Sequence, residues 1–207
     1  MQHIIKTLSF GAALLVAPLL AQAASAPPAL NTNPAAVQPG AYSVEPMHTR
    51  VLFALSHLGF TTWYGEFTHV SGTLTLNLKA LSKSKLDLII PANTISTSNT
   101  KVDAELNSPK WLDTARCPTI EFKSTQIVRT GHNTARVTGE LTFHGVTRLE
   151  ALNVTFNASG VNFLTHQYTV GFNATGLIKR SDFNETTYLP AIGNNVSLII
   201  SAAFVKP

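Results

Sequence analysis

Three histidines stand among large apolar residues in the stretch HTRVLFALSHLGFTTWYGEFTHV, which covers residues 48–70. His48, His57 and His69 carry imidazoles that can bind a metal ion or act as general bases near neutral pH. The apolar residues between them could instead enclose a hydrophobic ligand, with the histidines as polar residues at its edge. The chemistry of this stretch is therefore that of a histidine site or that of an apolar cavity.

The spacing of the histidines gives little support to a metal site. The chain has seven histidines, and no pair follows the H-x-H, H-x₃-H or H-E-x-x-H pattern. Distant strands could still bring His48, His57 and His144 together, but a separate position for each at a strand end is the simpler interpretation. We predict that the protein binds no metal.

Nucleophilic catalysis has no clear signature either. The chain lacks a G-x-S-x-G motif, and Cys117, beside Pro118, has no obvious base in the sequence. Cys117 is the only cysteine, so no internal disulfide can form, and we interpret it as a small, half-buried apolar residue. The residues alone do not call for an enzyme.

The chain begins with features of an exported protein. A basic start, an apolar run over residues 7–20 and an A-x-A site at 21–23 predict a signal peptide over residues 1–23. The uncharged, Pro- and Ala-rich residues 24–40 predict a flexible tether. Residues 41–207 have the length of one domain, and we expect this mature protein to be soluble because no later stretch predicts a membrane helix.

The charge of the chain argues against a nucleic-acid partner. The formal net charge is +4, and removal of Lys6 with the signal peptide lowers it by one. Charged residues make up only 13% of the chain, and the basic ones are dispersed rather than clustered. We therefore exclude nucleic acid as a partner.

From Tyr42 onward, apolar residues alternate with polar ones, which is typical of strands with one buried face. Three segments show the pattern most clearly, with the following residues on the apolar face: Val137, Gly139, Leu141 and Phe143; Tyr168, Val170, Phe172, Ala174 and Ile178; Val196, Leu198, Ile200, Ala202 and Phe204. The opposite, water-facing side is expected to carry Arg136, Glu140, Glu150, Asn173 and Lys179.

About eight such strands predict an all-β fold, an antiparallel barrel that can enclose one small ligand. Gly139, Ala174, Gly176 and Ala202 on the apolar faces would leave room inside. A sandwich is the alternative, whereas an outer-membrane barrel would need an unbroken apolar band outside. Residues 99–116 predict a short helical insertion, in which Ser108 and Pro109 start a second helix.

Six segments of the chain occur in an order that points to a known family. They are YSVEPMHTRVLFALSHLGF (42–60), WYGEFTHVSGTLTL (63–76), LNSPKWLDTARCPTIEF (106–122), VTGELTFHGVT (137–147), LIKRSDF (177–183) and VSLIISA (196–202). Together they resemble the YceI-like family of bacterial periplasmic proteins. The resemblance implies a lipocalin-like barrel, a periplasmic location and no established catalytic activity.

The resemblance also implies a ligand, an isoprenoid lipid such as an isoprenoid quinone or a polyprenyl phosphate, and no other cofactor. The apolar positions that would line its site are Phe53, Leu55, Phe60, Trp63, Phe67, Trp111, Leu112, Phe122, Phe143, Phe172 and Phe183. His48, His57 and Arg180 match polar positions that could meet a head group. Glu105 stands where the family helix often carries His, and a carboxylate at the mouth would favour a quinone or another neutral end over a phosphate.

The leading prediction is therefore a periplasmic binding or carrier protein for an isoprenoid lipid. We expect a monomer or homodimer that contacts a membrane only transiently. An enzyme that acts on an apolar or isoprenoid substrate, with His48 and His57 as its polar catalytic groups, is the alternative. An interaction module with a solid core is a third interpretation, and the small residues on the apolar faces argue against it.

Overall fold

The computed structural model describes residues 29–207; the predicted signal peptide lies outside these residues. The described residues form ten strands: β1 (Gly40–Val44), β2 (Arg50–His57), β3 (Thr61–Phe67), β4 (Ser71–Leu76), β5 (Lys85–Pro91), β6 (Thr119–Arg129), β7 (Thr134–Phe143), β8 (Val146–Val161), β9 (Tyr168–Lys179) and β10 (Asn195–Val205). They also form one α-helix and four short 3₁₀ helices: α1 (Thr100–Asn107), η1 (Pro34–Ala36), η2 (Leu81–Lys83), η3 (Ala92–Thr94) and η4 (Arg180–Phe183).

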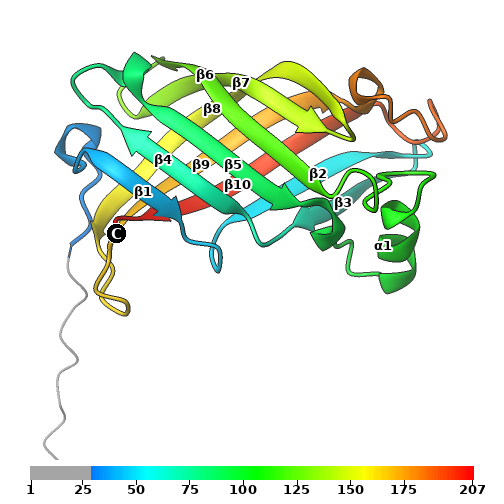
Figure 1. Ribbon diagram of the computed structural model, residues 1–207, viewed down its shortest axis with the longest axis horizontal. Coiled ribbons are helices and arrows are strands. Elements are labelled where there is room, and N and C mark those ends of the chain that lie inside the picture. The colour runs from blue at the N-terminus through cyan, green and yellow to red at the C-terminus, as the bar shows by residue number, and fades with distance from the viewer. Residues whose placement is uncertain (1–28) are drawn as a thin grey trace, which may run out of the picture.

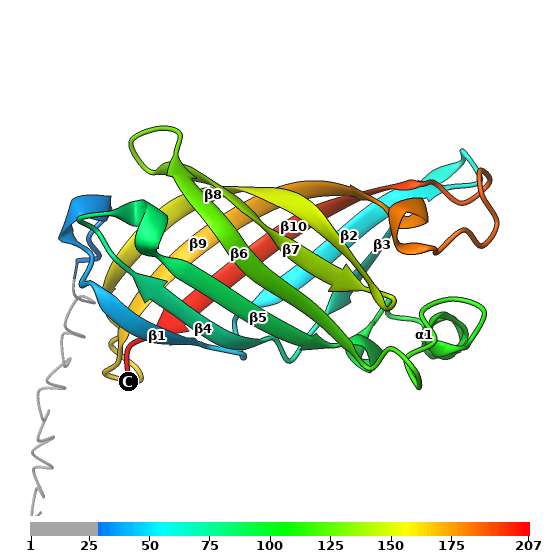
Figure 2. The same ribbon diagram turned by 45° about the horizontal axis from the view of Figure 1, so that its top comes forward.

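The strands form one antiparallel sheet that closes on itself. Its order is β1-β4-β5-β6-β7-β8-β9-β10-β2-β3, and β1 also pairs with β10. Strands β1 and β2 pair with different parts of β10, so together they act as one bent strand. Strands β3 and β4 pair with β2 and β1 respectively, so they form a second bent strand. The wall is therefore an eight-stranded barrel. Figures 1 and 2 show the closed sheet. The predicted barrel is confirmed, and the sandwich alternative is wrong.

Helix α1 and several connections lie together at one end of the barrel, which we call the helical end (Figure 1). It consists of α1, residues 108–118, the β2–β3 and β7–β8 turns, and the β9–β10 connection, residues 180–194. The side chain of Asn99 caps α1 by accepting the N–H groups of Lys101 and Val102. No helix of residues 29–207 has the length and apolar character needed to cross a membrane.

The predicted second helix at Ser108 is wrong, because residues 108–116 form turns. The N–H of Leu112 donates to the carbonyl of Leu106 over 3.0 Å, and that of Asp113 donates to the carbonyl of Ser108 over 3.0 Å. These bonds reach back six and five residues, instead of the four of an α-helix. These turns bury Leu112, which is 7% exposed. The burial of this side chain outweighs the preference for a helix start that Ser108 and Pro109 indicate.

Part of the predicted flexible tether lies against the barrel. Asn31 pairs with Ser159 of β8 through two backbone hydrogen bonds of 2.8 Å. Asn33 caps η1 by accepting the N–H of Ala35, and Val37, just after η1, is only 6% exposed. Residues 31–37 are therefore part of the folded body and lie at the end of the barrel opposite the helical end (Figure 1).

The alternation predicted for the strands holds, with one exception. Arg136, Glu140, Asn173 and Lys179 are exposed, as expected of the outer face. Glu150 was expected on that face too, but the structure places it in the interior wall, so this prediction is wrong. The reason is register: Glu150 lies directly opposite Gly139 of β7, and paired residues on neighbouring strands point to the same side of a sheet.

Candidate ligand-binding cavity

The barrel encloses a narrow apolar cavity with a volume of about 280 Å³. Side chains from every strand except β1 line it, together with Leu106, Trp111 and Leu112 from the helical end. The wall on β7 runs from Ala135 to Phe143, which spans ~27 Å along the strand at ~3.4 Å per residue and roughly 20 Å along the tilted barrel axis. The cavity is therefore long, narrow and suited to a flexible hydrocarbon chain.

Small residues contribute to this cavity in two ways. Ala174 and Ala202 belong to the wall and leave space in front of them. Gly139 instead makes room for an aromatic ring, since a Cβ at this position would lie 2.5 Å from Cζ of Phe122. A Cβ at Gly176 would lie 2.8 Å from a leucine side chain of β8. The two alanines widen the cavity, whereas the two glycines let neighbouring side chains pack across the sheet.

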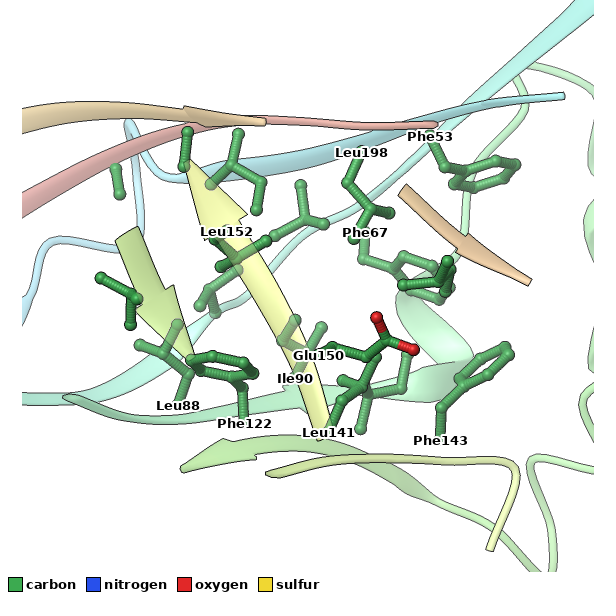
Figure 3. A pocket seen from close by; sticks show the side chains of 18 of the residues that line it. Phe53, Phe67, Leu88, Ile90, Phe122, Leu141, Phe143, Glu150, Leu152 and Leu198 are labelled. Carbon is green, nitrogen blue, oxygen red and sulfur yellow. The ribbon is translucent and has the colours of Figure 1, made fainter. Parts of the chain in front are cut away.

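Eight of the eleven apolar side chains predicted from the sequence belong to the cavity wall. They are Phe53, Leu55, Phe67, Trp111, Leu112, Phe122, Phe143 and Phe172. Figure 3 shows four of them, Phe53, Phe67, Phe122 and Phe143, around the same space. The structure thus brings together residues from β2, β3, β6, β7, β9 and the turn after α1, and their contact with a ligand stays a prediction.

The other three predicted side chains are not part of the wall. Phe60 is 85% exposed, because the turn between β2 and β3 carries it beyond the sheet. The ring of Trp63 packs beside that of His57, with centroids 5.1 Å apart. Phe183 is completely buried in η4 and packs edge-on behind Phe143 at 5.6 Å. Its role in the fold is to support the wall from outside.

The histidines do not come together. His48 and His57 flank opposite ends of β2, and neither lines the cavity. The His48 side chain is 79% exposed, with Nδ1 2.6 Å from a carboxylate oxygen of Glu45. His144 lies in the β7–β8 turn, with Nδ1 3.1 Å from the carbonyl oxygen of Phe183. Residues 29–207 contain no group of three or more His, Cys, Asp or Glu side chains that could hold a metal ion.

Arg180 does reach the cavity wall, but four of its five N–H donors are used within the protein. It is 4% exposed and forms a salt bridge with Glu185, which is 3% exposed. Its Nε donates to the carbonyl of Gly193 over 2.9 Å, and its Nη2 donates to the carbonyls of Thr187 and Ile192 over 2.8 Å each. This network holds the 180–194 connection in place, so Arg180 is a structural residue of the helical end.

The helical end is built from two connections that pack on each other. The Thr187 hydroxyl donates to the carbonyl of Lys110 over 2.7 Å, and the rings of Trp111 and Tyr188 lie 5.8 Å apart. The Trp111 indole N–H donates to the carboxylate of Glu105 over 3.1 Å. Glu105, expected to influence the head group, therefore orients a tryptophan of the cavity wall.

Glu150 is the cavity residue that the sequence analysis missed. Figure 3 shows its carboxyl group pointing into the cavity near Phe67, Leu141 and Phe143. No residue within 29–207 forms a hydrogen bond or ion pair with this side chain. Burial raises the pKa of Glu150, and the negative charge of Asp182 raises it further. Counting back in twos from Leu152, a wall residue, would have placed Glu150 inside.

Comparison with known proteins agrees with this architecture. The YceI-like domain profile matches residues 42–204. A UPF0312 protein of Yersinia pestis (strain Pestoides F) is 33% identical over 162 residues, which cover 78% of this chain and 83% of that protein. A UPF0312 protein of Pectobacterium atrosepticum is 32% identical over 165 residues, covering 80% of this chain and 85% of that protein.

Solved structures share the fold at lower identity. BcnA of Burkholderia cenocepacia superimposes with a TM-score of 0.70 at 20% identity, covering 77% of this chain and 98% of that one. A polyisoprenoid binding domain from Saccharophagus degradans gives a TM-score of 0.59 at 16% identity, covering 82% of this chain and all of that one. With the domain profile spanning almost the entire barrel, the conclusion is direct: this chain belongs to the YceI-like domain family.

Proposed function

We propose that this protein is a periplasmic binding or carrier protein that encloses the chain of an isoprenoid lipid, an isoprenoid quinone or a polyprenyl lipid, inside its barrel. The observation that carries the proposal is the long, narrow cavity, whose wall is almost entirely apolar. The likeness to a protein described as a polyisoprenoid binding domain supports the same ligand class. The predicted signal peptide supports the location.

The energetics favour a long chain over a small ligand. Burial of each methylene group contributes about 0.8 kcal/mol, so a chain that fills the cavity gains more than ~10 kcal/mol. Association itself costs ~4–15 kcal/mol, so micromolar binding requires most of the chain to lie inside. Short apolar molecules should therefore bind weakly.

The geometry gives no support to the alternative of an enzyme that uses His48 and His57. The two histidines lie at opposite ends of β2, outside the cavity wall. A general base must come within hydrogen-bond reach of the proton that it removes. A substrate inside the barrel would not meet either imidazole, so we propose binding rather than turnover.

Native mass spectrometry of protein isolated from the periplasm of a bacterium that expresses the full chain tests the proposal. We expect the protein in the osmotic-shock fraction, with a bound lipid of isoprenoid mass. Substitution of wall residues, Ala202→Phe and separately Ala174→Phe, should fill the cavity and abolish lipid binding. Ser201→Phe is the matched control, because Ser201 lies on the exposed face of β10.

Two results would contradict the proposal. One is wild-type protein that carries no lipid and binds neither added ubiquinone nor added polyprenol. The other is a cavity-filling variant that retains the lipid while its thermal unfolding shows an intact fold. Retention of the protein in the cytoplasmic fraction would refute the location alone.

A further inference from the structure

The position of Glu150 in the barrel suggests a role beyond enclosure of a chain. Its neighbour Leu149 points outward and is 67% exposed, whereas Glu150 points inward. The residue opposite it on β7 is Gly139, and the apolar ring of Phe122 fills the space in front of this glycine, so no polar side chain meets the carboxyl there. Glu150 therefore presents its carboxyl group to the open space of the cavity (Figure 3).

The charged groups around Glu150 do not compensate it. Arg148, two residues before Glu150 on the same side of β8, is exposed, donates to the carbonyl of Thr147 and forms no ion pair with Glu150. Glu140 of β7 and Lys179 of β9 lie on the outer face of the barrel and are exposed. Arg180 and Glu185, which also line the cavity, form a salt bridge with each other. Asp182 of η4 adds a negative charge that, with burial, raises the pKa of the Glu150 carboxyl and favours its neutral form.

The cavity wall has a second relevant property: it offers no free cation. Arg180 is the one basic side chain of the described wall, and its guanidinium already bonds Glu185 and three backbone carbonyls. A phosphate group drawn inside would lose its hydration without meeting a free positive charge, which is strongly unfavourable. A neutral polar group would need only one hydrogen-bond partner.

We propose that Glu150 recognises the polar end of the lipid, and that it selects a neutral oxygen-bearing group, a quinone carbonyl or a prenol hydroxyl, over a phosphate. This inference rests on the proposed function and names the class of head group. A protonated carboxyl donates its O–H to a carbonyl or hydroxyl oxygen, and its own carbonyl accepts from a hydroxyl. The head group of the lipid thereby supplies the hydrogen-bond partner that Glu150 lacks within the protein.

Binding of four ligands with the same isoprenoid chain tests this inference: a quinone, a prenol, a prenyl phosphate and the plain hydrocarbon. Isothermal titration calorimetry would compare the wild type with Glu150→Leu and Glu150→Gln. Glu140→Leu is the matched control, since Glu140 lies on the outer face of β7. In Glu150→Leu, the quinone and prenol should bind roughly 2- to 10-fold more weakly, as expected for one net hydrogen bond, and the hydrocarbon should bind at least as tightly.

Two further readouts separate recognition from a merely structural effect. Quinone affinity of the wild type should fall as the pH rises through the titration of Glu150, because the O–H donor is lost, whereas that of Glu150→Gln should stay constant. Of the four ligands, the prenyl phosphate should bind the wild type most weakly. At a pH where Glu150 is ionised, Glu150→Gln should bind it more tightly than the wild type does, because the carboxylate that repels the phosphate is absent.

The outcomes that would overturn the inference differ from those that concern the proposed function. If the preference for quinone or prenol over hydrocarbon survives in Glu150→Leu, Glu150 does not recognise the head group, although the protein still binds isoprenoid chains. A wild type that prefers the phosphate overturns the inference in the same way. If no ligand binds, including the hydrocarbon, the proposed function and this inference both fail.

Discussion

Glu185 and Glu150 are two acidic side chains in the wall of the same cavity, and they differ in what surrounds them. Glu185 is 3% exposed, pairs with Arg180 and accepts the N–H of Thr187 over 3.2 Å. Glu150 has no partner among residues 29–207. A buried carboxylate whose partners all come from the protein has a structural role. A carboxyl group in the cavity wall without such partners is a candidate for recognition of a ligand.

The largest effect is expected from removing Arg180, the ion-pair partner of Glu185. Arg180→Met leaves Glu185 buried without its counter-charge, which should lower the free energy of unfolding by about 3–5 kcal/mol. Urea denaturation measures this loss. A loss below about 1 kcal/mol would contradict the structural role assigned to Arg180.

A double variant tests the same ion pair. Arg180→Met combined with Glu185→Leu removes both charges and should be more stable than Arg180→Met alone. It should not recover the wild-type stability, because the carbonyls of Gly193, Thr187 and Ile192 still lack the donors of Arg180. Equal stability of the two variants would show that the isolated carboxylate is not what destabilises the single variant.

Replacement of Glu150, which has no partner, should change the free energy of unfolding by a smaller amount and in the opposite direction. Glu150→Leu removes a desolvated carboxyl and should raise the free energy of unfolding of the ligand-free protein by roughly 1 kcal/mol. Because the pKa of Glu150 is raised in the folded state, the wild type loses stability as the pH rises above ~4.3 and through the folded-state pKa. Thermal unfolding between pH 4 and 8 should therefore show a gap between variant and wild type that widens with pH.

A third carboxylate, Glu45, is an intermediate case at the rim of the barrel. Burial alone would raise its pKa, but hydrogen bonds from the His48 ring and from the N–H groups of Met47 and His48 hold it below its ordinary value. Glu45→Gln should therefore cost at most about 1 kcal/mol at neutral pH. The difference from the wild type should vanish as the pH falls below ~4.3 and through the lowered pKa, as urea denaturation would show.

The smallest expected effect is that of replacing His48. His48→Ala should leave the affinity for an isoprenoid chain unchanged, because His48 is 79% exposed in its side chain and is not part of the cavity wall. Titration calorimetry with the hydrocarbon and the quinone measures this. Weaker binding of the quinone alone would mean that the head group lies near the β1–β2 turn and not at Glu150.

Much of the cavity could be predicted from the sequence because strand alternation is a local property. The inward faces of β7, β9 and β10 follow from side chains that point to opposite sides in turn. This is why Leu141, Phe172 and Leu198 were correctly expected on one apolar side. The helix over residues 100–107 likewise rests on local spacing and the Asn99 cap.

Other features depend on how distant segments meet. Phe60 is apolar, yet its position in a turn takes it out of the cavity. Arg180 is cationic, yet four of its five N–H donors are used by the 180–194 connection. The composition of residues 31–37 indicates a tether, but pairing with β8 holds them on the barrel. A sequence pattern cannot reveal these partners, since they come from contacts between remote parts of the chain.

The sequence by itself determined that this protein is an antiparallel barrel of the YceI-like kind with an apolar interior, because alternation and ordered motifs are written along the chain. Only the tertiary structure decided which polar groups find partners in that interior. Strand alternation turns the carboxyl of Glu150 inward, but the fold leaves it without a partner among residues 29–207, while β2 holds His48 and His57 apart. Register and closure are long-range pairings, and they determine that the interior contains an unpartnered acid and no imidazole from this pair.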